Sequence, residues 1–236
     1  MGRIDVHSHL LPTVDDGCPT LEESLKCARM LVSAGYSHCF CTPHVWPSDR
    51  KIARDSVPLL VDDLQVALND AGIPLRLLPG GELNLHATVT HSTPDKIIDM
   101  ALAGQYILVD MWAEQLPDWF EPAIRWLENM DLTVILAHPE RMRAIQDQPE
   151  LGRQLIDMGL LLQGNLQCFA DRPESYTRRT AEQFLDEGLY FLLGSDLHNA
   201  DGLRTRLTGL QNAIEFAGGQ SIDMLTITNP RRLLPG

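Results

Sequence analysis

The sequence predicts an α/β fold in which parallel strands alternate with helices that pack outside them. Short apolar runs alternate with longer amphipathic segments along the 236 residues, and no linker, repeat or low-complexity block interrupts the alternation. With 44% hydrophobic and 22% charged residues, the chain can build a sizeable core. We therefore expect one domain over residues 1–236. Periodicity alone leaves open whether its strands form a doubly wound sheet or a closed barrel.

Seven short apolar runs are expected to form the strands, because each has the length of a strand rather than of a helix. Their spacing leaves room for one helical segment between consecutive strands, which is typical of parallel pairing. The expected strands are Ile4–Val6, Tyr36–Thr42, Leu75–Leu78, Tyr106–Val109, Leu132–Leu136, Leu160–Leu162 and Tyr190–Leu193.

The segments between these strands carry apolar residues at helical spacing. Thr20 and Glu23 form a capping-box pattern at the start of the first helix, and Gly35 is expected to end it. The tail from Ser221 to Leu234 is expected to be a helix or a turn. The expected helices are Thr20–Ala34, Val57–Ala71, Thr93–Ala103, Pro117–Met130, Pro149–Met158, Tyr176–Gly188 and Leu203–Ala217.

The charge and the cysteine content limit the class of protein. A net charge of −13 and an isoelectric point near 4.9 argue against nucleic acid and anionic membranes as main partners. No apolar run approaches the roughly 18 residues of a membrane span, and the N-terminus lacks a signal-peptide pattern. The cysteines, odd in number and without metal-finger spacing, are expected to be reduced thiols of a cytoplasmic protein. They are Cys18, Cys27, Cys39, Cys41 and Cys168.

Residues that commonly bind metals follow almost every expected strand. In an extended His-x-His segment both imidazoles point to the same side and can bind one ion, and carboxylates can bridge two ions. The recurrence at six strand ends therefore predicts a site for several divalent ions. His38, inside a strand, is expected to be structural, and His86 and His91 to be exposed. The expected ligands are His7, His9, Asp16, His44, Glu82, Asp110, His138, Asp196 and His198.

Several other catalytic mechanisms lack their sequence signature. None of the cysteines has an arginine six residues later, as the Cys-x5-Arg motif of cysteine-dependent phosphatases requires. No Gly-x4-Gly-Lys or Gly-x-Gly-x-x-Gly loop is present to bind a nucleotide, and no Gly-x-Ser-x-Gly segment is present to carry a nucleophilic serine.

The sequence resembles the PHP (polymerase and histidinol phosphatase) superfamily. Within it, the chain is most similar to the bacterial manganese-dependent tyrosine-protein phosphatases of capsule and exopolysaccharide clusters. The matching stretches span nearly the whole chain in the expected order. They are Ile4-Asp5-Val6-His7-Ser8-His9, Asp15-Asp16-Gly17, Leu21-Glu22-Glu23-Ser24, Thr42-Pro43-His44, Gly81-Glu82, Ala137-His138-Pro139-Glu140-Arg141, Gly194-Ser195-Asp196-Leu197-His198-Asn199 and Asn229-Pro230-Arg231.

The resemblance implies a distorted (β/α)7 TIM-like barrel, the PHP fold, with two or three Mn²⁺ ions; iron, zinc or magnesium would also suit these ligands. Glu82 would bridge two of the ions. The implied ligand sets are His7, His9, Glu82 and Asp196 for one ion, Glu82, Asp110 and His138 for a second, and Asp16, His44 and His198 for a third.

The resemblance also implies how phosphate is bound. Arg141, His44, Asp196 and His198 would act in catalysis, and Arg141 would bind the phosphate of the substrate. The chain departs from the family at two positions. Asp110 stands where the family usually has Glu, and Leu203 stands where it has a second phosphate-binding Arg. Arg204 is our candidate for that second contact, with Arg206 nearby.

The leading hypothesis is a metal-dependent phosphatase that acts on phosphotyrosine in proteins and regulates capsular or exopolysaccharide synthesis. Its protein partner would be a bacterial tyrosine kinase of polysaccharide synthesis. Two alternatives are a small-molecule phosphoesterase resembling histidinol phosphatase and a metal-binding regulatory module with little turnover. The substitutions at Asp110 and Leu203 favour the last of these. A barrel amidohydrolase is disfavoured, because no lysine stands at a strand end.

Overall fold

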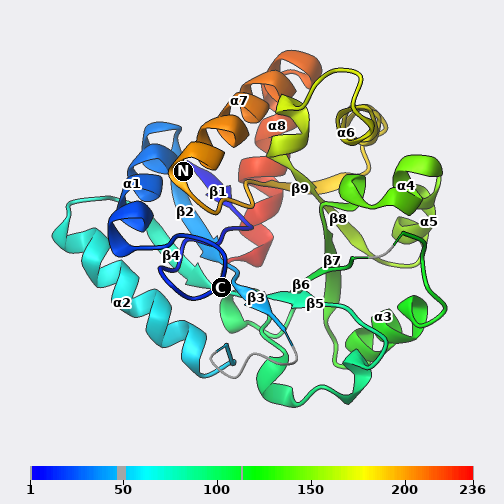
Figure 1. The fold of residues 1–236 in the computed structure, drawn as a ribbon, viewed down its shortest axis with the longest axis horizontal. Coiled ribbons are helices and arrows are strands. Elements are labelled where there is room, and N and C mark those ends of the chain that lie inside the picture. The colour runs from blue at the N-terminus through cyan, green and yellow to red at the C-terminus, as the bar shows by residue number, and fades with distance from the viewer. Residues whose placement is uncertain (1, 47–51, 113, 236) are drawn as a thin grey trace.

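The computed structural model describes residues 2–46, 52–112 and 114–235. The strands lie in the middle of the molecule and the longer helices lie around them (Figure 1). Every pair of neighbouring strands is parallel. The predicted α/β fold with outer helices is therefore confirmed. In the part of the chain that the structure describes, no helix is both long and apolar enough to cross a membrane.

The strands form two hydrogen-bonded sheets, ordered β1-β2-β4 and β3-β5-β6-β7-β8-β9. The short strand β3 follows β2 after two residues, and β5 likewise follows β4, so seven strand positions result, as predicted. The short strands β3 and β5 are not predicted from the sequence. The strands are β1 Arg3–Asp5, β2 Tyr36–Cys41, β3 His44–Val45, β4 Arg76–Pro79, β5 Glu82–Asn84, β6 Tyr106–Asp110, β7 Thr133–Ala137, β8 Leu161–Asn165 and β9 Tyr190–Gly194.

The segments that follow the first and last strands, β1 and β9, are joined. Ser8 forms a parallel bridge with Leu197, and the His9 amide donates to the Leu197 carbonyl over 2.9 Å. The Asp196 amide donates to the His7 carbonyl over 2.7 Å. These bonds hold the segments after β1 and β9 side by side, as a barrel-like arrangement requires, and bring their polar residues together.

The helices mostly match the predicted segments. Thr20 caps α1 by accepting a hydrogen bond from the Glu23 amide, but Glu23 accepts from the Ala200 amide at the start of α7 rather than closing the capping box. Glu23 thus ties α1 to α7. The short helix α4 was not predicted. The helices are α1 Leu21–Ser33, α2 Ser56–Asp70, α3 Phe120–Glu128, α4 Arg143–Asp147, α5 Leu151–Asp157, α6 Tyr176–Asp186, α7 Ala200–Ala217 and α8 Gly219–Asp223.

The helix predicted for Thr93–Ala103 is wrong. The chain forms separate 3₁₀ turns there, at Pro94–Lys96 and Met100–Leu102. Ile97 is extended between them, and Ala101 has a φ of 58°, which a helix cannot accommodate. The β-branched pair Ile97 and Ile98 is buried, so tertiary packing outweighs the helical spacing of the apolar residues.

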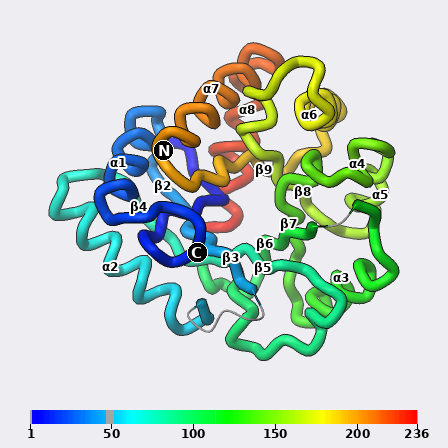
Figure 2. Tube along the Cα trace, viewed as in Figure 1, coloured from blue at the N-terminus to red at the C-terminus, as the bar shows by residue number. Residues whose placement is uncertain are grey.

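An apolar layer lies between the strands. It joins side chains from six strands, including Ile4, Phe40 and Ile135, to Leu233 in the C-terminal tail. The tail continues from α8 through a π turn, Met224–Thr228, into a 3₁₀ turn, Asn229–Leu233, as expected of a helix or turn. It contacts β1 and β9 and is coloured red in Figure 2. The polar residues at the strand ends therefore rest on a packed core.

Candidate metal centre

Eight of the nine residues predicted as ligands lie within four residues of the carboxyl end of a strand, and Asp16 lies further along the loop after β1. Most are buried; His44 and His198 are half-buried, and Asp16 is exposed. Two of them occupy left-handed backbone conformations, His138 with a φ of 38° and Asp196 with a φ of 52°. Such conformations are costly for residues other than glycine and are concentrated at functional sites, where they turn a side chain in a required direction.

A first group consists of His7, His9 and Glu82, whose ligand atoms lie within 4.8 Å of one another. Oε2 of Glu82 lies 3.3 Å from Nε2 of His7 and 3.4 Å from Nε2 of His9. Oδ1 of Asp196 lies 3.5 and 3.3 Å from the same two nitrogens. The four residues implied for one ion thus converge on one point.

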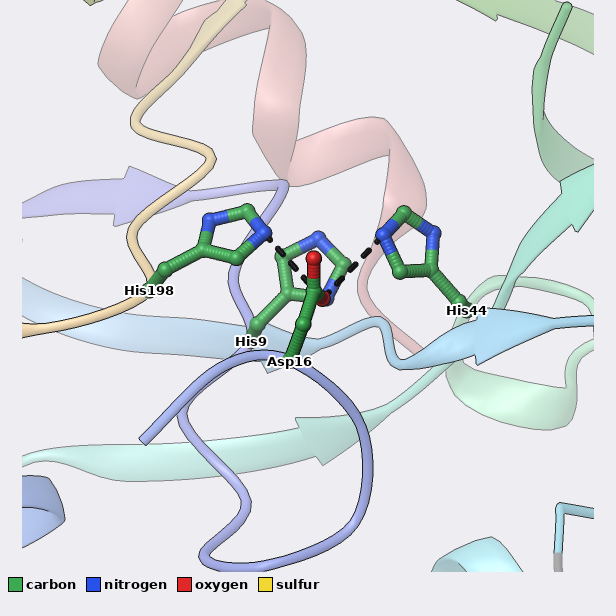
Figure 3. A group of neighbouring side chains, drawn as sticks. All are labelled: His9, Asp16, His44 and His198. Carbon is green, nitrogen blue, oxygen red and sulfur yellow. Dashed lines mark ion pairs between the residues drawn. The ribbon is translucent and has the colours of Figure 1, made fainter. Parts of the chain in front are cut away.

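A second group combines His9, Asp16, His44 and His198 (Figure 3). Oδ1 of Asp16 lies 3.4 Å from Nε2 of His44 and 3.4 Å from Nε2 of His198, between the two rings. The Asp16 side chain is 68% exposed. The structure therefore brings together the three residues implied for the third ion, on the solvent side of the centre.

Glu82 occupies the middle of the remaining group. Its Oε1 lies 3.0 Å from Nε2 of His138, whereas its Oε2 lies 2.8 Å from Nδ1 of His44. Asp110 joins His44 and Glu82 in a group within 4.8 Å, and its Oδ1 accepts a hydrogen bond from the Asn84 amide. Glu82 thus presents its two oxygens to different imidazoles, as a bridging carboxylate would.

Burial and neighbouring charges shift the pKa of several side chains in the centre. Burial by itself would raise the pKa of Glu82, but His7, His138 and His44 outweigh it and hold that pKa well below its usual range. Burial opposes charge on His9, yet the carboxylates around it raise its pKa well above the usual value. Burial and the neighbouring charge of Glu82 raise the pKa of Asp110 to about 6. Imidazolium protons and metal cations compete for the same nitrogens, so cation binding would release protons.

Three buried atoms of the centre make no hydrogen bond with any described residue: Nδ1 of His44, Oε2 of Glu82 and Oδ2 of Asp110. The first two are only 2.8 Å apart, yet their geometry is not that of a hydrogen bond. Buried polar atoms without partners are rare and call for a ligand. These three atoms belong to imidazole and carboxylate groups, which suit divalent cations such as Mn²⁺.

A second layer of polar residues holds these side chains in place. Oε1 of Gln163 lies 2.8 Å from Nδ1 of His7, and Oδ2 of Asp15 lies 2.7 Å from Nδ1 of His9. Partners of this kind orient a metal-binding imidazole and fix which nitrogen faces the ion. Neither Gln163 nor Asp15 is predicted as a supporting residue from the sequence. For Gln163 a signal does exist, because Gln163 and Asn165 are polar residues within the buried strand β8.

Arg141 lies at the edge of the centre, where Nη1 donates to Oδ2 of Asp196 over 2.9 Å. Arg204 is on the exposed side of α7, 66% exposed, and pairs with Asp201 at 3.5 Å. Arg206, two residues further on and therefore on the other side of α7, is buried, and its Nε donates to the carbonyls of Ser195 and Asp196. The structure thus places Arg141 and Arg206, and not Arg204, in contact with the loop that carries Asp196.

The remaining histidines lie outside the groups described above. His38 is half-buried in β2, His86 is half-buried and His91 is exposed. All five cysteines are buried free thiols. Of the three lysines, none of which is expected at a strand end, Lys51 lies outside the described residues.

A model of the family described as "Capsular polysaccharide synthesis, CpsB/CapC" matches residues 3–235. The chain belongs to the CpsB/CapC family. The predicted resemblance to the phosphatases of capsule clusters is therefore confirmed.

Relatives of this CpsB/CapC chain are named as tyrosine-protein phosphatases. It is 28% identical to the tyrosine-protein phosphatase YwqE of Bacillus subtilis (strain 168), over 98% of this chain and 91% of the relative. It is 27% identical to the tyrosine-protein phosphatase CpsB of Streptococcus agalactiae serotype V, over 84% of each chain.

A solved structure of tyrosine phosphatases also matches this chain. A chain from the crystal structures of YwqE from Bacillus subtilis and CpsB from Streptococcus pneumoniae, described as unique metal-dependent tyrosine phosphatases, matches with a TM-score of 0.86 and 27% identity, over 98% of this chain and 93% of that one. A putative 2-pyrone-4,6-dicarboxylic acid hydrolase from Pseudomonas putida, at 18% identity and a TM-score of 0.59, shares the fold alone.

Proposed function

We propose that the chain is a metal-dependent phosphatase that hydrolyses phosphotyrosine in proteins. The observation that carries this proposal is the place of Arg141. Its guanidinium touches Oδ2 of Asp196, while Oδ1 of the same carboxylate faces His7 and His9. A cation with a geometry suited to phosphate thus borders directly on the predicted metal ligands. Membership of the CpsB/CapC family supports the same activity.

The residues that we propose to hold the ions are the sets implied by the resemblance, and the contacts among them support this proposal. We assign His7, His9, Glu82 and Asp196 to one ion, and Glu82, Asp110 and His138 to a second. Asp16, His44 and His198 would hold a third. Bound Mn²⁺ would lower the pKa of a water molecule and neutralise charge on the phosphate. Iron, zinc and magnesium are alternatives that the same donor atoms accept.

The chain's own residues bind and orient the substrate. Arg141 would hold two phosphate oxygens through its guanidinium, which has five N–H donors and contacts Asp196 through Nη1. Asp196, His44 and His198 would act through their positions around that phosphate. Arg204 would contribute only after leaving Asp201, so we propose Arg141 as the principal phosphate contact.

The cellular role is the finer part of the proposal. The family description refers to capsular polysaccharide synthesis. We propose a cytoplasmic enzyme whose substrate is a phosphotyrosine-bearing protein, such as a tyrosine kinase of polysaccharide synthesis. Buried free thiols are consistent with a reducing compartment.

The test compares three substrates with the Mn²⁺-loaded protein: a phosphotyrosyl peptide, the matched phosphoseryl peptide and histidinol phosphate. The proposal predicts that kcat/KM is highest for the phosphotyrosyl peptide. Arg141→Ala should reduce that value about 100-fold or more, as expected when one charged transition-state contact is lost. Preference for histidinol phosphate would support the small-molecule alternative. An Arg141→Ala variant within about twofold of wild type would refute the phosphate contact.

A further inference from the structure

A cavity of about 290 Å³ opens beside the metal centre. Its lining includes His138 and Arg141, and His138 also contacts Glu82 at 3.0 Å. The cavity is therefore continuous with the point where Arg141 would hold a phosphate. Its volume is near the lower end of that of small-ligand sites, about 300 Å³, which suits one ring and not a large cofactor.

The other walls of this cavity are mainly apolar. They include Met111 and Met142, which are buried, and Trp112, whose side chain is 68% exposed. Because Trp112 is exposed and also lines the cavity, its ring is open to a bound ligand. The Arg141 guanidinium lies 5.7 Å from the centroid of the Trp112 ring, within the range of a cation–π contact. Trp112 thus stands next to the proposed phosphate contact.

We propose that this cavity is the subsite for the phenyl ring of phosphotyrosine, with Trp112 as its aromatic wall. The proposal rests on the proposed function and names the structural basis of its substrate class. With the phosphate at Arg141, an aryl ester places its ring directly against the indole, where offset or edge-on ring contacts are favourable. The thioethers of Met111 and Met142 also contact aromatic rings favourably. The short side chain of phosphoserine would leave these walls without contacts.

A second tryptophan supplies a built-in comparison. Trp46 is 38% exposed, and its ring lies 5.6 Å from that of His44. Trp46 is therefore next to the predicted third ion, whereas Trp112 is next to Arg141. If the phenyl ring binds at Trp46 instead, the two tryptophans exchange roles in the experiment below.

The experiment measures binding without turnover. Calorimetry on the Mn²⁺-loaded protein compares phenylphosphonate with methylphosphonate, which carry the same anionic group and are not hydrolysed. We expect wild type to bind phenylphosphonate about tenfold more tightly, and Trp112→Ala to lose most of that preference. Trp112→Phe should restore it, because a ring is again present. Phe216→Ala, which removes a 49% exposed ring at the far end of α7, is the matched control and should behave as wild type.

Each outcome separates the ring subsite from the proposed function. A preference for phenylphosphonate that survives in Trp112→Ala, or that is lost only in Trp46→Ala, overturns the subsite. The peptide assay is read on the same variants: Trp112→Ala should lose kcat/KM for the phosphotyrosyl peptide and not for methyl phosphate. If wild type hydrolyses phosphotyrosine and Trp112→Ala retains full selectivity, the proposed function stands and the subsite fails. If wild type hydrolyses no phosphotyrosine, the proposed function fails first.

Discussion

The side-chain amide of Asn165 donates a hydrogen bond of 2.8 Å to Oδ2 of Asp196. The same oxygen accepts from Arg141 over 2.9 Å, so Oδ1 is the oxygen left to face His7 and His9. Asn165 therefore determines which oxygen of Asp196 points into the centre. The backbone N–H of Asn165 donates to Oε1 of the buried Glu140, so Asn165 links the end of β8 to the segments after β7 and β9.

Asn165→Ala should weaken metal binding because Asp196 loses the bond that orients it. Losing one such supporting partner typically costs about 10–100-fold in metal affinity. We expect turnover of a phosphotyrosyl peptide to require correspondingly more Mn²⁺, and high Mn²⁺ to restore much of it. Titration of activity and of bound Mn²⁺ would measure this shift.

Asn212→Ala is the matched control for that variant. Asn212 also donates from its side-chain amide, to the Phe169 carbonyl, but it lies on α7 outside the centre. Its loss should lower stability and leave the Mn²⁺ requirement unchanged. An equal shift in both variants would show that general destabilisation, and not the orientation of Asp196, explains the effect.

Arg206 is expected to position the loop that carries Asp196 and His198. Its Nε donates to the carbonyls of Ser195 and Asp196 at 2.6 and 2.9 Å. Arg206→Lys removes this shared N–H donor, so the buried Ser195 carbonyl loses its bond while the Asp196 carbonyl keeps only its contact with Nδ1 of His198. Such a loss costs about 1–3 kcal/mol of unfolding free energy. We expect kcat to fall more than KM rises. Arg153→Ala, on the exposed surface of α5, should change neither quantity.

Alkylation of cysteines should not inactivate the native protein. All five thiols are buried, and burial raises the pKa of Cys39, Cys41 and Cys168, which disfavours their thiolates. The contact with Cys27 lowers the pKa of Cys18, but Cys18 is fully buried and so is shielded from the reagent. Treatment with iodoacetamide should leave phosphatase activity intact, with mass spectrometry showing unmodified protein. Loss of activity in step with alkylation, while the circular dichroism spectrum stays native, would contradict a mechanism without cysteine.

Gly209 is expected to be essential for the packing of α7. A Cβ at this position would lie 1.8 Å from the carbonyl oxygen of Leu166, in the 3₁₀ segment that follows β8. Because the obstacle is backbone, Gly209→Ala should destabilise the protein by about 1–3 kcal/mol or more. Gly219→Ala, where a Cβ meets nothing within 4 Å, should be neutral or slightly stabilising. Urea unfolding of both variants would measure the difference.

The sequence predicts the strand positions well because each apolar run is short, and all of them except Leu160–Leu162 are followed by an expected metal ligand. It fails at Thr93–Ala103, where burial of Ile97 and Ile98 outweighs helical spacing. The partners Gln163 and Asn165 are also beyond its reach, since their contacts join strands distant in the chain.

The choice of the second arginine shows the same limit of sequence-based prediction. The family's second arginine corresponds to Leu203 in this chain, and Arg204 is nearer to that position in sequence than Arg206 is. On a helix, however, side chains lean toward the N-terminus, so the residue one turn beyond Leu203 covers the same place. Arg206 accordingly reaches back to Asp196, while Arg204 turns to solvent.

The central claim is that hydrolysis of phosphotyrosine depends on divalent ions held at the strand ends. The most direct test removes metal from the wild-type protein by exhaustive chelation, then restores Mn²⁺ stepwise while bound metal and phosphate release are measured in the same samples. The account predicts no phosphate release from a phosphotyrosyl peptide after chelation and recovery as Mn²⁺ binds, with no recovery in His138→Ala. Full activity in samples that elemental analysis shows to be free of metal would contradict it.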